Sequence, residues 1–234
     1  MKKSIIFAVA LAMSFSTLKA QSTVKPIGKS NITLTSDKMT PEALWAMGRI
    51  AGAQASPDGK HIVYQVGYYS VKENKGHQVI CVMDSDGKNI KQLTTSSKSE
   101  SDPVWINGGK KIAFLSDGQI FTMNIDGSDR KKLTNDKTGI DGFKFSPDEK
   151  KVILIKQIPF HESIQKNPDD LPKATGRVVT DLNYRHWDEY VESIPHPYLA
   201  EVTPNGITEG TDILEGEPYE CPMKPFGGVE QLAW

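Results

Sequence analysis

The chain has 234 residues, and its 28 Lys and Arg against 29 Asp and Glu give a formal net charge of −1. This balance indicates neither a nucleic-acid groove nor a polybasic membrane surface, so we expect neither partner. Hydrophobic residues make up 38% of the chain, below the usual globular share, which suits many short strands with one solvated face better than a thick helical core.

Residues 1–20 are expected to be a signal peptide and no part of the fold. Two lysines precede an apolar run that begins at Ile5, and small residues lead to Ala20. The run is too short and too interrupted to span a bilayer, so no membrane association is expected after cleavage. The Met-Lys-Lys beginning of the sequence is typical of exported bacterial proteins. We therefore predict a mature chain that begins near Gln21 and works in the periplasm or outside the cell.

Cys81 and Cys221 are the two cysteines, and an exported protein can form disulfides. Two interpretations remain open. The cysteines form one disulfide, or both thiols are free and Cys81 is buried in a strand. No pattern of His, Asn or Asp around either cysteine indicates an activated nucleophile.

A polar lead-in and a short helix are predicted ahead of the strands. Residues 21–38 are aperiodic and polar, which indicates a flexible segment. Thr40 is a suitable N-cap, Pro41 fits the first helical position, and Gly48 ends the pattern. The apolar face of this helix consists of Leu44, Trp45 and Met47. We expect that face to pack on the rim of the folded chain.

The same sequence pattern occurs twice within residues 82–134. Residues 82–94 return as residues 122–134, which gives a period of 40 residues. Each copy is centred on an Asp-Gly pair, which readily takes the positive φ angles of a tight hairpin turn. Repeats of roughly 40 to 50 residues built from hairpins are typical of a β-propeller, whose blades have four antiparallel strands.

A second repeated feature is a turn that leads into an apolar strand. Residues 56–64 begin with Ser-Pro-Asp-Gly-Lys, and related segments occur at 105–114 and 145–154. The last of these has Glu149 in place of the expected glycine, which a type I turn tolerates.

These repeats predict an all-β chain with an incomplete propeller over residues 39–234. Two complete blades are expected at about 49–94 and 103–134, and a third is interrupted by an insertion at about 158–197. Ala233 and Trp234 align with Val104 and Trp105, so a fourth blade would begin there. Propellers typically need about four to eight blades to close. We therefore expect an open edge, which would make the isolated chain marginally stable or prone to aggregate.

The insertion carries more chemistry than a linker needs. Its middle, residues 183–190, concentrates aromatic and charged side chains.

Taken together, these motifs resemble one family of enzymes. The helix at Trp45, the turn that starts at Ser56, the two Asp-Gly hairpins and the Arg-His-Trp-Asp-Glu segment that follows Tyr184 resemble the prolyl oligopeptidase family of serine peptidases. Within it, the nearest likeness is to secreted bacterial dipeptidyl-peptidase five and acylaminoacyl-peptidase relatives. The resemblance implies an N-terminal propeller that covers a C-terminal α/β-hydrolase domain, whose Ser, Asp and His carry out acyl transfer. We expect these 234 residues to end before such a domain begins.

No catalytic residue is expected within these 234 residues. A nucleophile elbow of the form Gly-x-Ser-x-Gly does not occur in the sequence. Hydrolysis needs the elbow, a paired general base and an oxyanion hole, so the chain alone should be inactive.

The resemblance also implies an acid on the propeller that holds the free amino terminus of the substrate. Asp188 and Glu189 are the candidates, and in a strand only one of them would point inward. The residues expected to line the substrate cavity are Tyr184, Arg185, His186, Trp187 and Tyr190. The alternative is that Asp188 or Glu189 forms a surface ion pair with Arg185.

No metal or cofactor is expected. None of the five histidines has a second histidine at ligand spacing, and the glycines follow Asp or Asn in turns rather than forming a phosphate loop. The partners implied by the resemblance are peptide substrates, reached through the complete enzyme, and the missing hydrolase domain. Homodimerisation of the full-length enzyme stays open.

Two functions follow from these observations. The first is the propeller of an exported serine exopeptidase, which gates and positions peptides whose N-terminal dipeptides or acyl-amino acids are released. The second is a non-enzymatic periplasmic propeller of the Tol-associated type that binds a protein partner, because such propellers use the same Ser-Pro-Asp-Gly turns.

Overall fold

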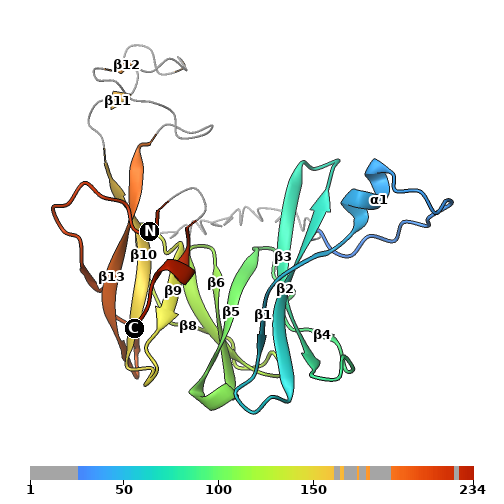
Figure 1. The fold of residues 1–234 in the computed structure, drawn as a ribbon, viewed down its shortest axis with the longest axis horizontal. Helices are drawn as coiled ribbons and strands as arrows, with labels where there is room; N and C mark the ends of the chain where they lie inside the picture. Colours follow the sequence, from blue (N-terminus) through green and yellow to red (C-terminus); the bar gives the residue numbers. More distant parts are fainter. Residues whose placement is uncertain (1–25, 161–163, 166–172, 174–177, 180–190, 224–226) are drawn as a thin grey trace, which may run out of the picture.

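The computed structural model describes residues 26–160, 164–165, 173, 178–179, 191–223 and 227–234. Three antiparallel sheets stand side by side, each rotated relative to the last (Figure 1). A short helix, α1 (Pro41–Ala46), precedes them. The prediction of an all-β chain with four-strand blades and an unclosed ring is confirmed. Among the described residues no helix is long and apolar enough to cross a membrane.

The strands follow the predicted blades in chain order. The first blade contains β1 (Arg49–Ala55), β2 (His61–Ser70), β3 (Lys75–Asp84) and β4 (Lys91–Gln92). The second contains β5 (Glu100–Ile106), β6 (Lys111–Ser116), β7 (Gln119–Asn124) and β8 (Lys131–Lys132). The third contains β9 (Gly142–Phe145), β10 (Lys151–Pro159), β13 (Ser193–Thr203), β14 (Gly206–Ile207) and β15 (Thr211–Asp212). The remaining elements are the strand pair β11 (Ile164–Gln165) and β12 (Val178–Val179), and the 3-10 turns η1 (Asn107–Gly109) and η2 (Val229–Gln231).

The third blade is longer than the sequence suggested. Strands β10 and β13 stay paired as far as Pro159 and Ser193, so both ends of the range 158–197 belong to the blade. The predicted insertion was therefore too wide. Pro195 and Pro197 lie within β13, although the prolines spread over residues 158–197 had suggested a break in the blade.

The repeated residues make the same bonds in both copies. The hydroxyl groups of Thr94 and Thr134 accept hydrogen bonds from the backbone N–H of Ile80 and Ile120, each at 2.9 Å. Both threonines are buried. Each threonine side chain therefore supplies an acceptor for a backbone N–H that the short outer strand of its blade does not pair with.

The two Ser-Pro-Asp turns also match. Ser56 donates to the carboxylate of Asp58 at 2.6 Å, and Ser146 donates to Asp148 at 2.7 Å. These serine hydrogen bonds lower the pKa of both carboxyl groups most. The backbone N–H groups two residues after each aspartate lower it further. At neutral pH both aspartates are thus held ionised within their turns.

The side chain of Glu149 links two blades, whereas the sequence predicted only that the turn would tolerate it. Its φ angle is +57°, in the left-handed region that favours glycine. Its carboxylate accepts the backbone N–H of Asn107 at 2.8 Å, which ties the third blade to the second. The contact gives a reason for glutamate where the matching turn has glycine.

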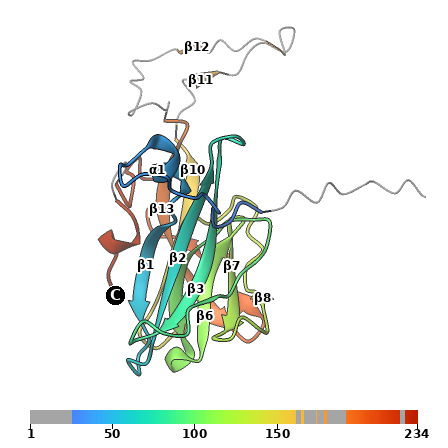
Figure 2. The same ribbon diagram turned by 90° about the vertical axis from the view of Figure 1, so that its right-hand side faces the viewer.

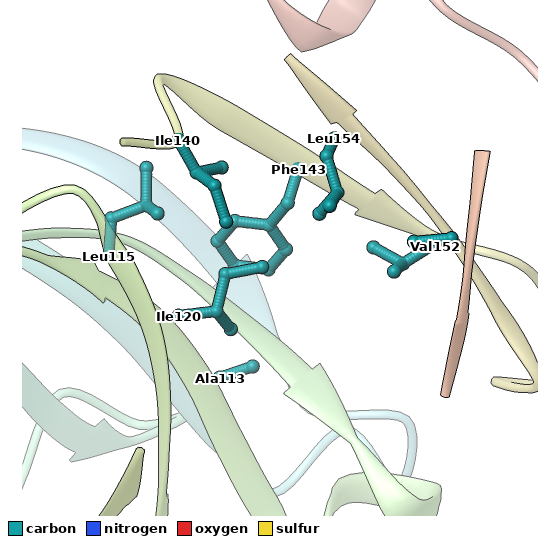
Figure 3. Packing of buried hydrophobic residues seen from close by; sticks show 8 residues of the cluster. Ala113, Leu115, Ile120, Ile140, Phe143, Val152 and Leu154 are labelled. Carbon is teal, nitrogen blue, oxygen red and sulfur yellow. The ribbon is translucent and has the colours of Figure 1, made fainter. Parts of the chain in front are cut away.

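The core lies between the blades. One cluster joins the first two blades and consists of Val63, Ile80, Ile112, Phe114 and Met123. Figure 3 shows a second cluster, in which side chains of the second blade face those of the third: Ala113, Leu115, Ile120, Ile140, Phe143, Val152 and Leu154. Burial of each large apolar side chain contributes about 1.5–3 kcal/mol. Each blade is therefore stabilised mainly by its neighbours.

The end of the chain contacts the third blade through a tryptophan. The indole N–H of Trp234 donates to the carbonyl of Lys144 at 3.2 Å. Trp105 of the second blade donates in the same way to Gln54 of the first at 3.1 Å. Lys144 and Gln54 both stand two residues before a Ser-Pro turn. The two tryptophans thus make equivalent contacts with the preceding blade.

Both cysteines are free. Cys81 is buried in β3 of the first blade, and Cys221 follows β15 of the third. Burial raises the pKa of the Cys81 thiol to about 11, so the group stays protonated and unreactive. Of the two interpretations, the structure has free thiols.

Candidate functional site

The seven predicted site residues lie outside the described residues. These are Tyr184, Arg185, His186, Trp187, Asp188, Glu189 and Tyr190. Their place in the chain is nevertheless defined, because they fall between β10 and β13. The backbone N–H of Phe160 donates to the carbonyl of Glu192 at 3.1 Å, one step beyond the last paired residues of these strands. The insertion therefore begins and ends at the tip of this hairpin.

The three central hairpins differ in length. The β2–β3 hairpin has ten residues in each strand, and β10 and β13 have nine and eleven, whereas β6 and β7 have six each. In Figure 1 the two long hairpins rise at the same end of the molecule, on either side of the short one. Helix α1 lies at that end too (Figures 1 and 2). This end is consequently the one that carries the insertion.

A cavity of about 380 Å³ lies where the first strands of all three blades meet. Bulges in β1 and β5 bring Gly52 and Asp102 to its wall, both with φ angles in the left-handed region. Gln157 of β10 and Pro195 of β13 line it as well. The cavity thus marks the axis around which the blades are arranged, and it adjoins the hairpin that carries the insertion.

The polar groups of the cavity are acidic or neutral. Its carboxylates are those of Asp102, Asp141 and Glu230, and no Lys, Arg or His is found among its described lining residues. The walls between them are largely apolar and include Val104 and Phe143. Such a surface attracts a cationic group, for example the ammonium at the end of a peptide.

A chain of hydrogen bonds joins this cavity to the start of β13. The carboxylate of Asp141 accepts from the amide nitrogen of Gln157 at 2.6 Å. The amide oxygen of Gln157 in turn accepts from the hydroxyl of Ser193 at 3.0 Å. Ser193 is the first residue of β13. An acid in the cavity is therefore positioned by Gln157 of β10 and by the first residue of β13.

The sequence alone did not identify Asp102 or Asp141 as candidate site residues. Asp102 precedes Pro103 and Asp141 precedes Gly142, which are ordinary turn dipeptides. Their common feature is that each stands on or directly before the first strand of a blade. An alignment of the repeats at the first strand of each blade could have identified both aspartates.

The described residues contain no group of three or more His, Cys, Asp or Glu side chains placed to hold a metal ion. The three cavity carboxylates are thus not arranged as a metal centre.

The chain is similar to bacterial dipeptidyl-peptidases over most of its length. It is 46% identical over 206 residues to dipeptidyl-peptidase 5 of Porphyromonas gingivalis and 41% identical over 206 residues to dipeptidyl-peptidase 5 of Porphyromonas endodontalis. Each match covers 86% of this chain and 30% of the relative, so the chain spans about a third of the length of these curated relatives. No protein-family model matches the chain.

Solved structures share the fold. The acylaminoacyl peptidase of Pyrococcus horikoshii superposes with a TM-score of 0.52 at 14% identity, over 72% of this chain and 26% of that one. At this identity the likeness supports the architecture alone.

Proposed function

We propose that this chain, which belongs with the N-terminal propellers of prolyl oligopeptidase-family peptidases, forms the substrate-admitting propeller of an exported serine exopeptidase. The observation that carries the proposal is the 46% identity to dipeptidyl-peptidase 5 across 86% of the chain. The acidic axial cavity supports it, because a peptide's free amino terminus is cationic.

In this proposal the propeller selects and orients, and another part of the enzyme does the chemistry. The serine, histidine and aspartate of acyl transfer would be supplied by an α/β-hydrolase domain, since these 234 residues contain no nucleophile elbow. The cavity acids attract the peptide by its ammonium, and the apolar walls exclude solvated or folded segments.

The insertion would complete the site. Asp188 or Glu189 would hold the substrate ammonium by a charge-assisted hydrogen bond, worth about 1.5–3 kcal/mol. A dipeptidyl-peptidase measures two residues from that ammonium, so a fixed carboxylate sets the cleavage position. The support is positional: the insertion leaves the blade at the tip of the hairpin whose Gln157 and Pro195 line the axial cavity.

Kinetics on the enzyme encoded by the complete gene test this function. Reading the coding sequence past residue 234 should show further blades and a Gly-x-Ser-x-Gly elbow. Asp188→Asn or Glu189→Gln should then lower turnover of dipeptidyl substrates with a free amine and spare N-blocked ones. Wild-type turnover of free-amine substrates by both variants would place the anchor elsewhere.

Two further measurements address the remaining points. The chain of residues 21–234 by itself should hydrolyse neither dipeptidyl nor acyl-aminoacyl chromogenic substrates, and turnover sensitive to a serine-directed inhibitor would contradict this. Mass spectrometry of the exported protein should find an N-terminus near Gln21. A coding sequence that continues without a hydrolase domain would instead favour the Tol-associated type of propeller that binds a protein partner.

A further inference from the structure

A second cavity, of about 320 Å³, lies at the rim of the first blade. We call it the Arg49 pocket. The residues that define it are Trp45, Arg49, Tyr69, Val71 and Lys75, from the end of α1, the start of β1 and the β2–β3 hairpin. Its size falls at the lower end of the range of about 300–1,000 Å³ that is usual for small-molecule sites. The pocket is separate from the axial cavity and shares no lining residue with it.

Two aromatic rings hold the guanidinium of Arg49. Its central carbon lies 4.8 Å from the ring centre of Trp45 and 4.4 Å from that of Tyr69. The two rings meet edge to face with their centres 5.7 Å apart. Stacking of this kind attracts the flat face of the cation and leaves its N–H groups at the edge free to donate. Among the described residues, Arg49 is thereby oriented without a carboxylate partner.

The backbone keeps the Tyr69 ring in place. Gly76 is paired with Tyr69 across the hairpin. A Cβ atom added at Gly76 or at Gly67 would come within 3.2 Å of the Tyr69 side chain. Absence of side chains at both positions lets the ring lie flat on the hairpin. The wall of the pocket is therefore preformed, which lowers the entropic cost of binding.

The charges of the pocket are all positive. Arg49 and Lys75 line it, and no Asp or Glu is found among its described lining residues. Among the described residues, neither cation has a side-chain hydrogen bond or ion pair in the structure. Two unpaired cations beside aromatic and aliphatic walls match a ligand with an anionic end and an apolar body. Arginine's fork of donors fits a carboxylate in particular.

We propose that the Arg49 pocket binds an organic carboxylate attached to an apolar group, such as the C-terminal carboxylate of a peptide that ends in a hydrophobic residue. Arg49 donates to both carboxylate oxygens, and Lys75 adds a second positive charge. Trp45, Tyr69 and Val71 cover the apolar group. This proposal does not depend on peptidase activity, because it concerns the rim of the first blade and not the axial cavity.

Calorimetric titration of the full polypeptide with N-acetyl-L-phenylalanine tests the proposal. N-acetyl-L-phenylalanine amide has the same ring without the charge, and acetate has the charge without the ring. Both should bind at least roughly tenfold more weakly, because each lacks one of the two interactions. Equal binding of the acid and its amide, or no binding of the acid up to about 10 mM, would overturn the proposal.

Variants assign the binding to this pocket. Arg49→Gln should weaken binding of the acid by roughly tenfold or more, and Arg49→Lys should recover only part of it, because lysine keeps the charge and lacks the fork. Lys72→Gln is the matched control, since Lys72 is on the same hairpin and does not line the pocket. Its affinity should stay within about twofold of wild type. Unchanged affinity in Arg49→Gln, with an unaltered circular dichroism spectrum, would refute the assignment.

Discussion

Lys156→Met should destabilise the third blade strongly, because it removes one partner of a buried ion pair. The ammonium of Lys156 lies 2.5 Å from the carboxylate of Asp136, and the two side chains are only 7% and 8% exposed. Lys156 also donates to the carbonyl of Glu209 at 2.6 Å and lies 4.6 Å from the ring centre of Tyr198. Methionine keeps most of the packing volume and loses the charge.

The magnitude follows from what remains around the carboxylate. Breaking a buried pair by removing one partner typically costs about 3–5 kcal/mol. Asp136 keeps hydrogen bonds from the N–H and hydroxyl of Thr138 and from the N–H of Gly139. These still stabilise its charge, so we expect a loss near the lower end, about 3 kcal/mol. For a chain of this size that corresponds to a melting temperature lower by roughly 6–12 °C.

The loss should depend on pH in a defined direction. Burial of Asp136 opposes its ionisation, but hydrogen bonds from Lys156 and Thr138 outweigh burial and lower its pKa below 3.8. A carboxyl group with a lowered pKa stabilises the fold above its unfolded value, and this contribution is lost as pH falls through the folded value. The difference between wild type and Lys156→Met should therefore be full at neutral pH and shrink below about pH 4.

Urea denaturation followed by circular dichroism, at neutral pH and in acid, measures both effects. The double variant Asp136→Asn/Lys156→Met should be more stable than Lys156→Met alone, because it leaves no unpaired charge. Lys88→Met is the control: its ammonium lies 2.8 Å from Asp86, but the side chains are 78% and 53% exposed, so stability should hardly change. Equal losses in Lys156→Met and Lys88→Met would refute the argument from burial.

Three further comparisons test the repeated segments by urea denaturation. Gly127→Ala should cost about 1 kcal/mol more than Gly87→Ala, because both residues have positive φ but a Cβ would meet a backbone carbonyl, at 3.0 Å, only at Gly127; equal losses would contradict the inter-blade contact. Thr134→Val should cost about 1–3 kcal/mol by leaving the buried N–H of Ile120 without an acceptor, and an unchanged midpoint would contradict this. Glu149→Ala should be less stable than Glu149→Gly by about 1 kcal/mol, since both lose the inter-blade bond and only glycine relieves the left-handed backbone; equal stability would argue against strain there.

The sequence by itself determined the local architecture of this protein. The 40-residue period, the Asp-Gly hairpins and the Ser-Pro-Asp turns predicted four-strand blades, and the structure has them. Thr40 and Pro41 likewise predicted the short helix α1. These features depend on residues a few positions apart, whose φ preferences and hydrogen bonds act within one turn or hairpin. The residues of the insertion, including Asp188 and Glu189, remain a prediction.

Contacts between blades were decided only by the tertiary structure. From the sequence, Glu149 was expected only to be tolerated in its turn. Its hydrogen bond to the backbone N–H of Asn107 depends on how two blades pack. Asp102 and Asp141 lie 39 positions apart in sequence, and they share a cavity only because the first strands of successive blades converge on one axis. The Arg49 pocket likewise needs a helix, a strand and a hairpin tip together. No local pattern encodes such sites, because their geometry is set by packing between separate elements.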